Sequence, residues 1–364
     1  MKKEISLYIH IPFCIKKCLY CDFLSFSDLS KTEEYVASLI KEIEAFSTDA
    51  VVKSIFIGGG TPSAIEPKYM AQIMNVVNNH FKIDENAEIT IEANPGTLTE
   101  EKALIYKACG INRLSMGLQA WQNNLLRILG RIHTREDFLK SFCIAQKYFD
   151  TNVDLMFALP KQTMNDWEES LVAVTELEPQ HISAYSLIIE EGTPFYNSYP
   201  TSPCDDELDR QMYYRAKEIL ADKGYIHYEI SNFAKKGHKS IHNLTYWQRG
   251  EYKGFGLGAA SLINNSRLKN TSRLSEYISG ATVIEKEDIS VADQISEFMF
   301  LGLRCIDGIS ISHFKKVFNR DVFQVYPKQL RDLCDKGLIE IKEDNIRLTE
   351  KGIDLSNMVF VEFI

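Results

Sequence analysis

The chain has 364 residues, of which 45% are hydrophobic and 25% charged, a composition typical of globular rather than disordered or fibrous proteins. Its 41 basic and 50 acidic residues give a formal net charge of −9, so no overall basic field is present and we expect no nucleic-acid partner. No apolar run reaches the roughly 18 residues of a membrane-spanning helix, and no signal-peptide cleavage site follows the first residues. These features predict a cytoplasmic protein. Because single hydrophobic cores stop growing at roughly 250–300 residues, we expect more than one domain.

Short β-rich runs alternate with helical patterns over about the first 190 residues. Strands are predicted at 4–10, 53–59, 87–94, 111–117, 153–160 and 181–187, and helices at 31–46, 67–81, 99–109, 134–149 and 165–177. Since parallel strands need crossover helices, the alternation predicts an α/β fold with a parallel sheet. Six repeats favour a partial (β/α)6 barrel over a complete barrel of eight units.

A different pattern begins near residue 290. Helical periods at 292–304, 311–318 and from residue 327 precede two short strands, an arrangement that resembles a winged-helix domain. This segment carries no concentrated basic stripe, so we interpret it as a packing or protein-contact module rather than a DNA-binding one. The predicted organisation is a barrel over 1–200, a linker or extension segment over 201–285 and a winged-helix-like domain over 286–364.

Three of the eight cysteines, Cys14, Cys18 and Cys21, lie within eight residues directly after the first predicted strand. Clustered thiols in a large chain without a signal peptide indicate metal or redox chemistry rather than disulfides. A structural zinc site normally has a fourth Cys or His ligand, which this segment lacks. The spacing therefore favours a [4Fe-4S] cluster with one open iron, and a zinc site is the alternative.

Unusual residues also follow the next predicted strands. A glycine-rich segment, residues 58–62, follows the second strand, Glu92 lies at the third and Gln119 follows the fourth. Because the carboxyl ends of parallel strands meet at one edge, these residues predict a shared site. Consecutive glycines let a ligand approach the backbone, and a carboxylate or amide can engage an ammonium or hydroxyl group. A tight turn and helix caps are the structural alternatives.

The cysteine array, the preceding YIHIPF segment and the GGGTP segment together resemble the radical S-adenosylmethionine superfamily. In that superfamily the open iron of a [4Fe-4S] cluster binds the amino and carboxyl groups of S-adenosylmethionine. The resemblance implies that the cluster ligands are Cys14, Cys18 and Cys21. It implies S-adenosylmethionine contacts from Tyr8, Gly59, Gly60, Thr61 and Glu92. Further residues match positions lining the adjacent second-ligand region, namely Tyr20, Gln119, Arg131 and Asp154.

The chain further resembles the coproporphyrinogen oxidase-like branch of that superfamily, through segments such as EANPGT, INRLSMGLQ, DLMFALPKQT and HNLTYW. This branch contains oxygen-independent coproporphyrinogen III oxidases and HemW-type haem chaperones. The oxidases continue the cysteine triad with a further cysteine where this chain has Asp22 and Phe23. They also carry an N-terminal extension, which we do not expect with Cys14 so near the start. Both differences match the chaperones.

His242, in the HNLTYW segment, is the candidate haem ligand. An imidazole can bind haem iron axially, and Tyr246 and Trp247 offer flat apolar area for a macrocycle or for the core. Ala260 stands where many relatives have a histidine, so that position offers no ligand. Three scattered cysteines are further thiolate candidates that nothing in the sequence separates, namely Cys143, Cys204 and Cys305.

The resemblance implies a haem chaperone that binds haem and delivers it to client haem proteins, respiratory ones among them. Handover is expected near the cytoplasmic face of the membrane, through peripheral contact, and the chain is expected to be a monomer or a dimer. The alternative is the oxidase, which decarboxylates two propionates of coproporphyrinogen III. Whether the protein is an enzyme is therefore open at this point.

Overall fold

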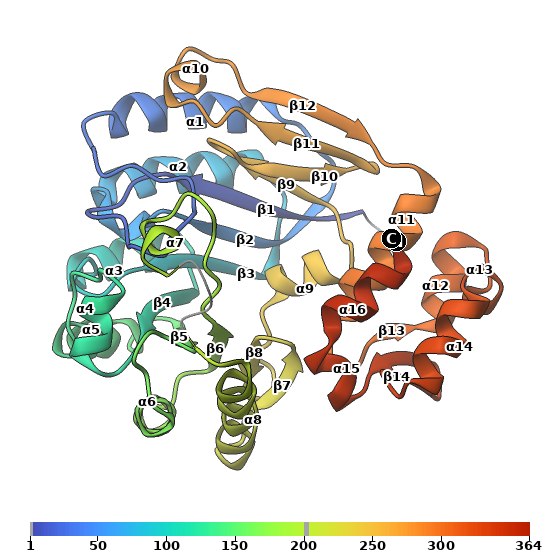
Figure 1. Cartoon of the computed structure of the whole chain (residues 1–364). Helices are drawn as coiled ribbons and strands as arrows, with labels where there is room; N and C mark the ends of the chain where they lie inside the picture. Colours follow the sequence, from blue (N-terminus) through green and yellow to red (C-terminus); the bar gives the residue numbers. More distant parts are fainter. Residues whose placement is uncertain (1–2, 200–203) are drawn as a thin grey trace.

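The computed structural model describes residues 3–199 and 204–364, and its central feature is one curved sheet (Figure 1). Twelve strands follow the order β12-β11-β10-β9-β1-β2-β3-β4-β5-β6-β8-β7 in the described residues. The middle six are parallel and confirm the predicted strands. Their bounds are β1 Glu4–Ile11, β2 Val51–Gly59, β3 Ile83–Ala93, β4 Arg113–Gln119, β5 Asp150–Phe157 and β6 His181–Ser186.

Helices connect these strands and cover the outer face of the sheet (Figure 1). Four of them begin at threonines, Thr99, Thr134, Thr163 and Thr193, whose side chains accept hydrogen bonds from the first-turn backbone. Thr134 and Thr163 form complete capping boxes with an aspartate three residues later. The helices are α1 Thr32–Ala45, α2 Pro67–His80, α3 Glu100–Ala108, α4 Asn123–Ile128, α5 Arg135–Ala145, α6 Met164–Glu176 and α7 Pro194–Ser198, with a 3-10 turn at Pro62–Ala64.

The core lies between these helices and the sheet. Ile5, Leu7, Ile9 and Ile11 of β1 are all at most 3% exposed, as expected for a parallel strand inside an α/β fold. The outermost strands, β12 and β7, are not paired with each other within the described residues. The barrel is therefore open, as predicted.

The segment predicted as a linker or extension adds strands to both edges of the same sheet. β8 and β7 extend the β6 edge in antiparallel fashion, whereas β9 runs parallel to β1. The predicted limit between residues 200 and 201 lies outside the described residues. The elements of this part are α8 Asp206–Asp222, β7 Ile226–Glu229, β8 Asn232–Ala234, α9 Ile241–Trp247, β9 Tyr252–Phe255, β10 Ala260–Ile263, β11 Ser266–Asn270, α10 Leu274–Ile278 and β12 Val283–Asp288.

The C-terminal part packs beside α9 (Figure 1). The two strands predicted here are present as β14 and β15, but the prediction missed a third. The two-residue strand β13 pairs with β15 and makes a three-stranded sheet of order β13-β15-β14. Two residues are too few to show a β period in the sequence. The elements are α11 Val291–Gly302, β13 Ile309–Ser310, α12 Ile311–Phe318, α13 Val322–Val325, α14 Pro327–Asp335, β14 Ile339–Lys342, β15 Asn345–Leu348, α15 Glu350–Asp354, α16 Ser356–Phe360 and a 3-10 turn at Val361–Phe363.

Among the helices in the described part of the chain, none has the length and apolar character needed to cross a membrane.

Candidate functional site

A cavity of about 370 Å³ lies at the carboxyl ends of the central strands. Parallel α/β barrels place their ligand sites at this edge, because the loops that follow the strands converge there. Of the predicted site residues, only Tyr8 and His242 do not line it. Those that do are Cys14, Cys18, Tyr20, Cys21, Gly59, Gly60, Thr61, Glu92, Gln119, Arg131 and Asp154.

The cysteine loop follows β1 and is tied to the barrel by backbone hydrogen bonds. The Cys14 amide donates to the Phe26 carbonyl at 2.9 Å, and the Leu19 amide donates to the Leu129 carbonyl at 3.1 Å. All three thiols are free, with Cys14 buried and the other two half-buried.

The three thiols line one cavity. In a [4Fe-4S] cluster each thiolate binds a different iron, so three cysteines on one cavity wall fit such a group. Within the described residues, no three Cys, His, Asp or Glu side chains are placed to bind a single metal ion.

The glycine-rich turn lies directly against the cysteine strand. The Gly60 amide donates to the Ile11 carbonyl at 2.9 Å, and a Cβ on Gly60 would lie 2.7 Å from the Phe13 carbonyl oxygen. Gly59 has a φ of +111°, and a Cβ there would lie 2.4 Å from the His10 ring. Close approach of two segments of the chain therefore requires glycine here, and it keeps the turn within reach of the thiols.

Two carboxyl groups share the cavity wall. Glu92 accepts a hydrogen bond from the Gly59 amide at 3.0 Å, and burial together with nearby Asp154 raises the pKa of Glu92 to about 8. Burial also raises the pKa of Asp154, although Asn152 donates to it at 2.7 Å and Ser115 at 3.2 Å. A cationic ligand would favour the ionised form of both groups, so the wall suits an ammonium or a sulfonium.

Arg131 is one of the cations that line the cavity. Its guanidinium donates to Asn94 at 3.0 Å, to the Gly117 carbonyl at 3.2 Å and to Gln119. A Cβ on Gly117 would lie 2.6 Å from this guanidinium, and Gln119 has a φ of +68°. The buried Nε of Arg131 has no hydrogen-bond partner in the described structure. A carboxylate-bearing ligand could supply one.

Sequence reasoning missed several residues in the floor of the cavity because it considered only strand ends. They come from alternate positions of buried strands, where side chains share one face: Arg113 and Ser115 on β4, Asn152 on β5, and Ser183 and Tyr185 on β6. The signal was present in the sequence as polar residues with a period of two inside otherwise apolar strands.

Tyr8 lies behind the cavity wall. Its hydroxyl is 2.9 Å from His10 Nδ1, and its ring stacks near Phe56 with centroids 6.3 Å apart. Burial raises its pKa well above the ordinary value, and the Glu92 charge contributes. Tyr8 is thus close to Glu92 without lining the cavity.

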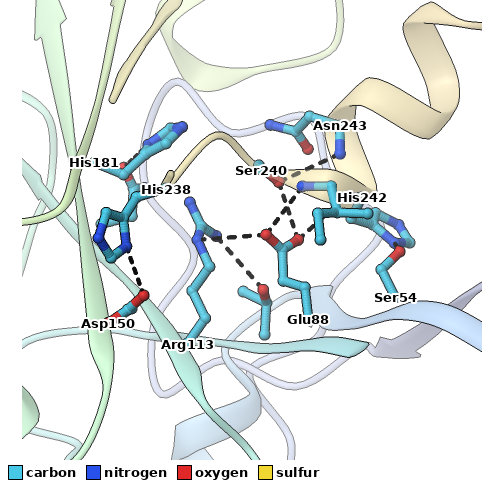
Figure 2. A network of polar contacts seen from close by, with 12 residues as sticks. Ser54, Glu88, Arg113, Asp150, His181, His238, Ser240, His242 and Asn243 are labelled. Atoms are coloured by element: carbon cyan, nitrogen blue, oxygen red, sulfur yellow. Dashed lines mark hydrogen bonds and ion pairs between the residues drawn. The ribbon is translucent and has the colours of Figure 1, made fainter. Parts of the chain in front are cut away.

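His242, the candidate haem ligand, is a buried residue in this structure. The side chain is 1% exposed, and its Nδ1 lies 2.9 Å from the Ser54 hydroxyl (Figure 2). Its Nε2 lies 2.9 Å from the Tyr246 hydroxyl. Burial lowers its pKa to about 3, and the Arg113 charge adds to this effect. Both nitrogens are engaged, so this imidazole offers no free coordination position in the structure, and Tyr246 belongs to the same polar cluster.

Comparison with known proteins shows which family the chain belongs to. The model of the radical SAM superfamily matches residues 8–174, and that of the HemN C-terminal domain matches residues 289–355. The heme chaperone HemW of Bacillus subtilis is 38% identical, with 99% of each chain covered. This chain belongs to the HemW family. The HemW of Escherichia coli is 32% identical, with 96% of this chain and 95% of that protein covered.

A solved structure supports the fold assigned to this HemW family member. Coproporphyrinogen III oxidase (HemN) from Escherichia coli, described as a radical SAM enzyme, has a TM-score of 0.85. It is 22% identical, and the match covers 100% of this chain and 90% of that one. The radical-SAM fold with a HemN-type C-terminal domain is therefore confirmed.

Proposed function

We propose that this chain is a haem chaperone that binds haem and delivers it to client haem proteins. The observation that carries the proposal is the similarity to the heme chaperone HemW of Bacillus subtilis over 99% of both chains. Phe23, two residues after Cys21, where the oxidases have a further cysteine, also supports the chaperone over the oxidase. The fold shared with HemN does not choose between them, because one fold can host different functions.

In this proposal Cys14, Cys18 and Cys21 hold a [4Fe-4S] cluster. When bound, the cluster supplies one open iron position for the amino and carboxyl groups of S-adenosylmethionine. The chain surrounds that position with a backbone cradle at residues 59–61 and with the Glu92 carboxyl. Tyr8 acts from behind the wall by facing Glu92.

The second-ligand region of the proposal adds both charge signs. Asp154 offers an anionic partner and Arg131 a cationic one, with Gln119 fixing the guanidinium and Tyr20 beside it. Such a pair suits a zwitterionic amino-acid moiety. This region is the proposed place of a second molecule of S-adenosylmethionine.

The wider features of the proposal have two sources. The sequence patterns support the division into 1–200, 201–285 and 286–364 and a cytoplasmic location. The resemblance supports handover to clients, such as respiratory haem proteins, near the membrane face, and a monomeric or dimeric state is expected.

The test is anaerobic reconstitution of the full chain with iron and sulfide, followed by titration with haem. We expect equal amounts of bound iron and acid-labile sulfide, lost in Cys14→Ala and kept in Cys109→Ala, whose thiol lies outside the cavity. We also expect haem to bind near equimolar amounts.

The same sample, given coproporphyrinogen III, S-adenosylmethionine and a reductant, separates the two functions. No porphyrin product is expected. Formation of protoporphyrinogen would overturn the chaperone proposal, and bound zinc without sulfide would overturn the cluster.

A further inference from the structure

A second cavity, of about 430 Å³, lies between α9 and the C-terminal elements. Its volume is in the range of small-molecule sites, which are mostly apolar with a few polar groups. Leu244, Trp247 and Phe298 form apolar and aromatic walls. A thiol, an imidazole and an ammonium group come from Cys305, His313 and Lys239. We refer to it as the seam cavity.

The HNLTYW helix α9 faces both cavities. Asn243 lines the barrel cavity, whereas Leu244 and Trp247 line the seam cavity. His242 lies between them and is buried. In Figure 1, α9 accordingly stands between the sheet and the C-terminal helices. Of the two aromatic residues of the motif, Trp247 is thus directed to the seam, whereas Tyr246 contacts His242.

His313 differs from His242 in the property that matters for metal binding. It is exposed, in the first turn of α12, with its ring centroid 5.7 Å from that of Phe298. Within the described part of the chain, no hydrogen bond engages its ring nitrogens, and its backbone amide donates to the Ser310 hydroxyl at 3.0 Å. An imidazole whose ring nitrogens are not engaged can bind haem iron.

The other groups of the seam cavity have different roles. Burial, with the charges of Glu229 and Asp307, raises the pKa of Cys305 to about 11, so this thiol stays protonated at neutral pH and forms part of the wall. Lys239 lies 4.0 Å from Asp307, and its side chain is 41% exposed. Such a weakly paired ammonium can bind a carboxylate.

Trp247 is held in place by a cation. The Arg304 guanidinium lies 4.3 Å from the centroid of the Trp247 ring, which fixes the indole as part of the wall. The buried indole Nε1 has no hydrogen-bond partner among the described residues.

We propose that the seam cavity is a haem-binding site, in which the edge of the macrocycle packs between Trp247 and Phe298 and His313 supplies the axial ligand. Lys239 pairs with a propionate at the rim. The inference rests on the proposed haem chaperone function and assigns the haem to a place separate from the barrel cavity.

The test is titration of the full-length chain with ferric haem, followed by absorption spectroscopy. We expect His313→Ala to weaken binding more than about tenfold and to remove the imidazole-ligated spectrum. His80→Ala is the matched control, because His80 is also exposed but lies at the end of α2. Leu244→Trp should weaken binding by filling the cavity without removing an iron ligand.

The outcomes separate this site from the proposed function. Absence of haem binding by the unaltered chain would overturn the chaperone proposal itself. Binding that is unchanged in His313→Ala would overturn the seam site alone. A thiolate-ligated spectrum that Cys305→Ser removes would overturn the assignment of His313 as the axial ligand, because Cys305 lines the same cavity. Because His313 is exposed, its replacement leaves the core intact. The His313→Ala variant therefore tests the seam site even if Leu244→Trp fails to fold.

Discussion

At the scale of single residues, the most informative feature is the pair of carboxyl groups in the barrel cavity. Burial and the Asp154 charge raise the pKa of Glu92 to about 8, so Glu92 is largely protonated at neutral pH without a ligand. A bound ammonium would lower that pKa, since an opposite charge favours the ionised form. Ligand binding should then release a proton from Glu92.

The affinity for S-adenosylmethionine should therefore increase with pH. Below pH 8 the ligand must displace the Glu92 proton, so its affinity should rise by up to about tenfold per pH unit and level off above pH 8. The measurement is calorimetric titration of the reconstituted chain with S-adenosylmethionine between pH 6 and pH 8, compared with Glu92→Gln.

Glu92→Gln should bind more weakly and should lose this slope. The titration of the ligand itself is common to both proteins, so the difference between them isolates Glu92. Equal slopes in both proteins would place the ammonium elsewhere.

At the scale of elements, α9 has only seven residues, and its position depends on a residue from β3. The Glu88 carboxylate accepts hydrogen bonds from the Ser240 hydroxyl at 3.2 Å and from the amides of Ile241 at 3.0 Å and His242 at 3.1 Å (Figure 2). Arg113 lies 4.0 Å away. An anion at a helix N-terminus satisfies amides that have no partner within the helix.

Replacing Glu88 should loosen α9 within an otherwise intact barrel. We expect Glu88→Ala to reduce the free energy of unfolding by roughly 1–3 kcal/mol, because buried amides and the Arg113 charge lose their partner. Amide hydrogen exchange should quicken over residues 241–247. Glu85→Ala, an exposed change on the same strand, should alter stability by less than about 0.5 kcal/mol. Unchanged exchange over α9 would show that packing alone holds it.

At the scale of the whole molecule, the C-terminal part is joined to the barrel through ion pairs of very different burial. Arg249, just after α9, is paired with Glu297 of α11 at 2.7 Å, and the two side chains are 9% and 10% exposed. Arg210 of α8 reaches Asp354 at 3.0 Å in a more exposed setting. Only the buried pair is expected to contribute strongly to stability.

Breaking the buried pair should therefore weaken the attachment of the C-terminal part. We expect Glu297→Ala to reduce the free energy of unfolding by roughly 3 kcal/mol, since it leaves the Arg249 charge buried without its partner. Urea denaturation would measure the loss, and hydrogen exchange should rise over residues 289–355. Glu287→Ala removes the exposed carboxylate that pairs with Arg267 at 3.4 Å and should have little effect. Similar losses in both variants would contradict the assignment.

Local patterns in the sequence predicted the parts of this protein that depend on neighbouring residues. The alternation of strand and helix patterns was enough to predict the six central strands, because side-chain periodicity and helix caps act over only a few residues. The cysteine loop and the glycine turn were recognisable for the same reason. Once parallel strands align, residues that follow them meet at one edge, so most of the predicted site residues line one cavity.

Tertiary structure decided what depends on distant partners. His242 is turned inward by Ser54, 188 residues away in the chain, and no local pattern announces such a bond. Strands β8 and β9 join opposite edges of the parallel strands, at β6 and β1, because those edges offer unpaired backbone groups, a property of the assembled sheet. The seam cavity likewise exists only where α9 meets the C-terminal elements. Local sequence patterns therefore determined the central strands and which kinds of side chain follow them. Long-range packing determined which strands extend the sheet, where His242 lies and where the seam cavity forms.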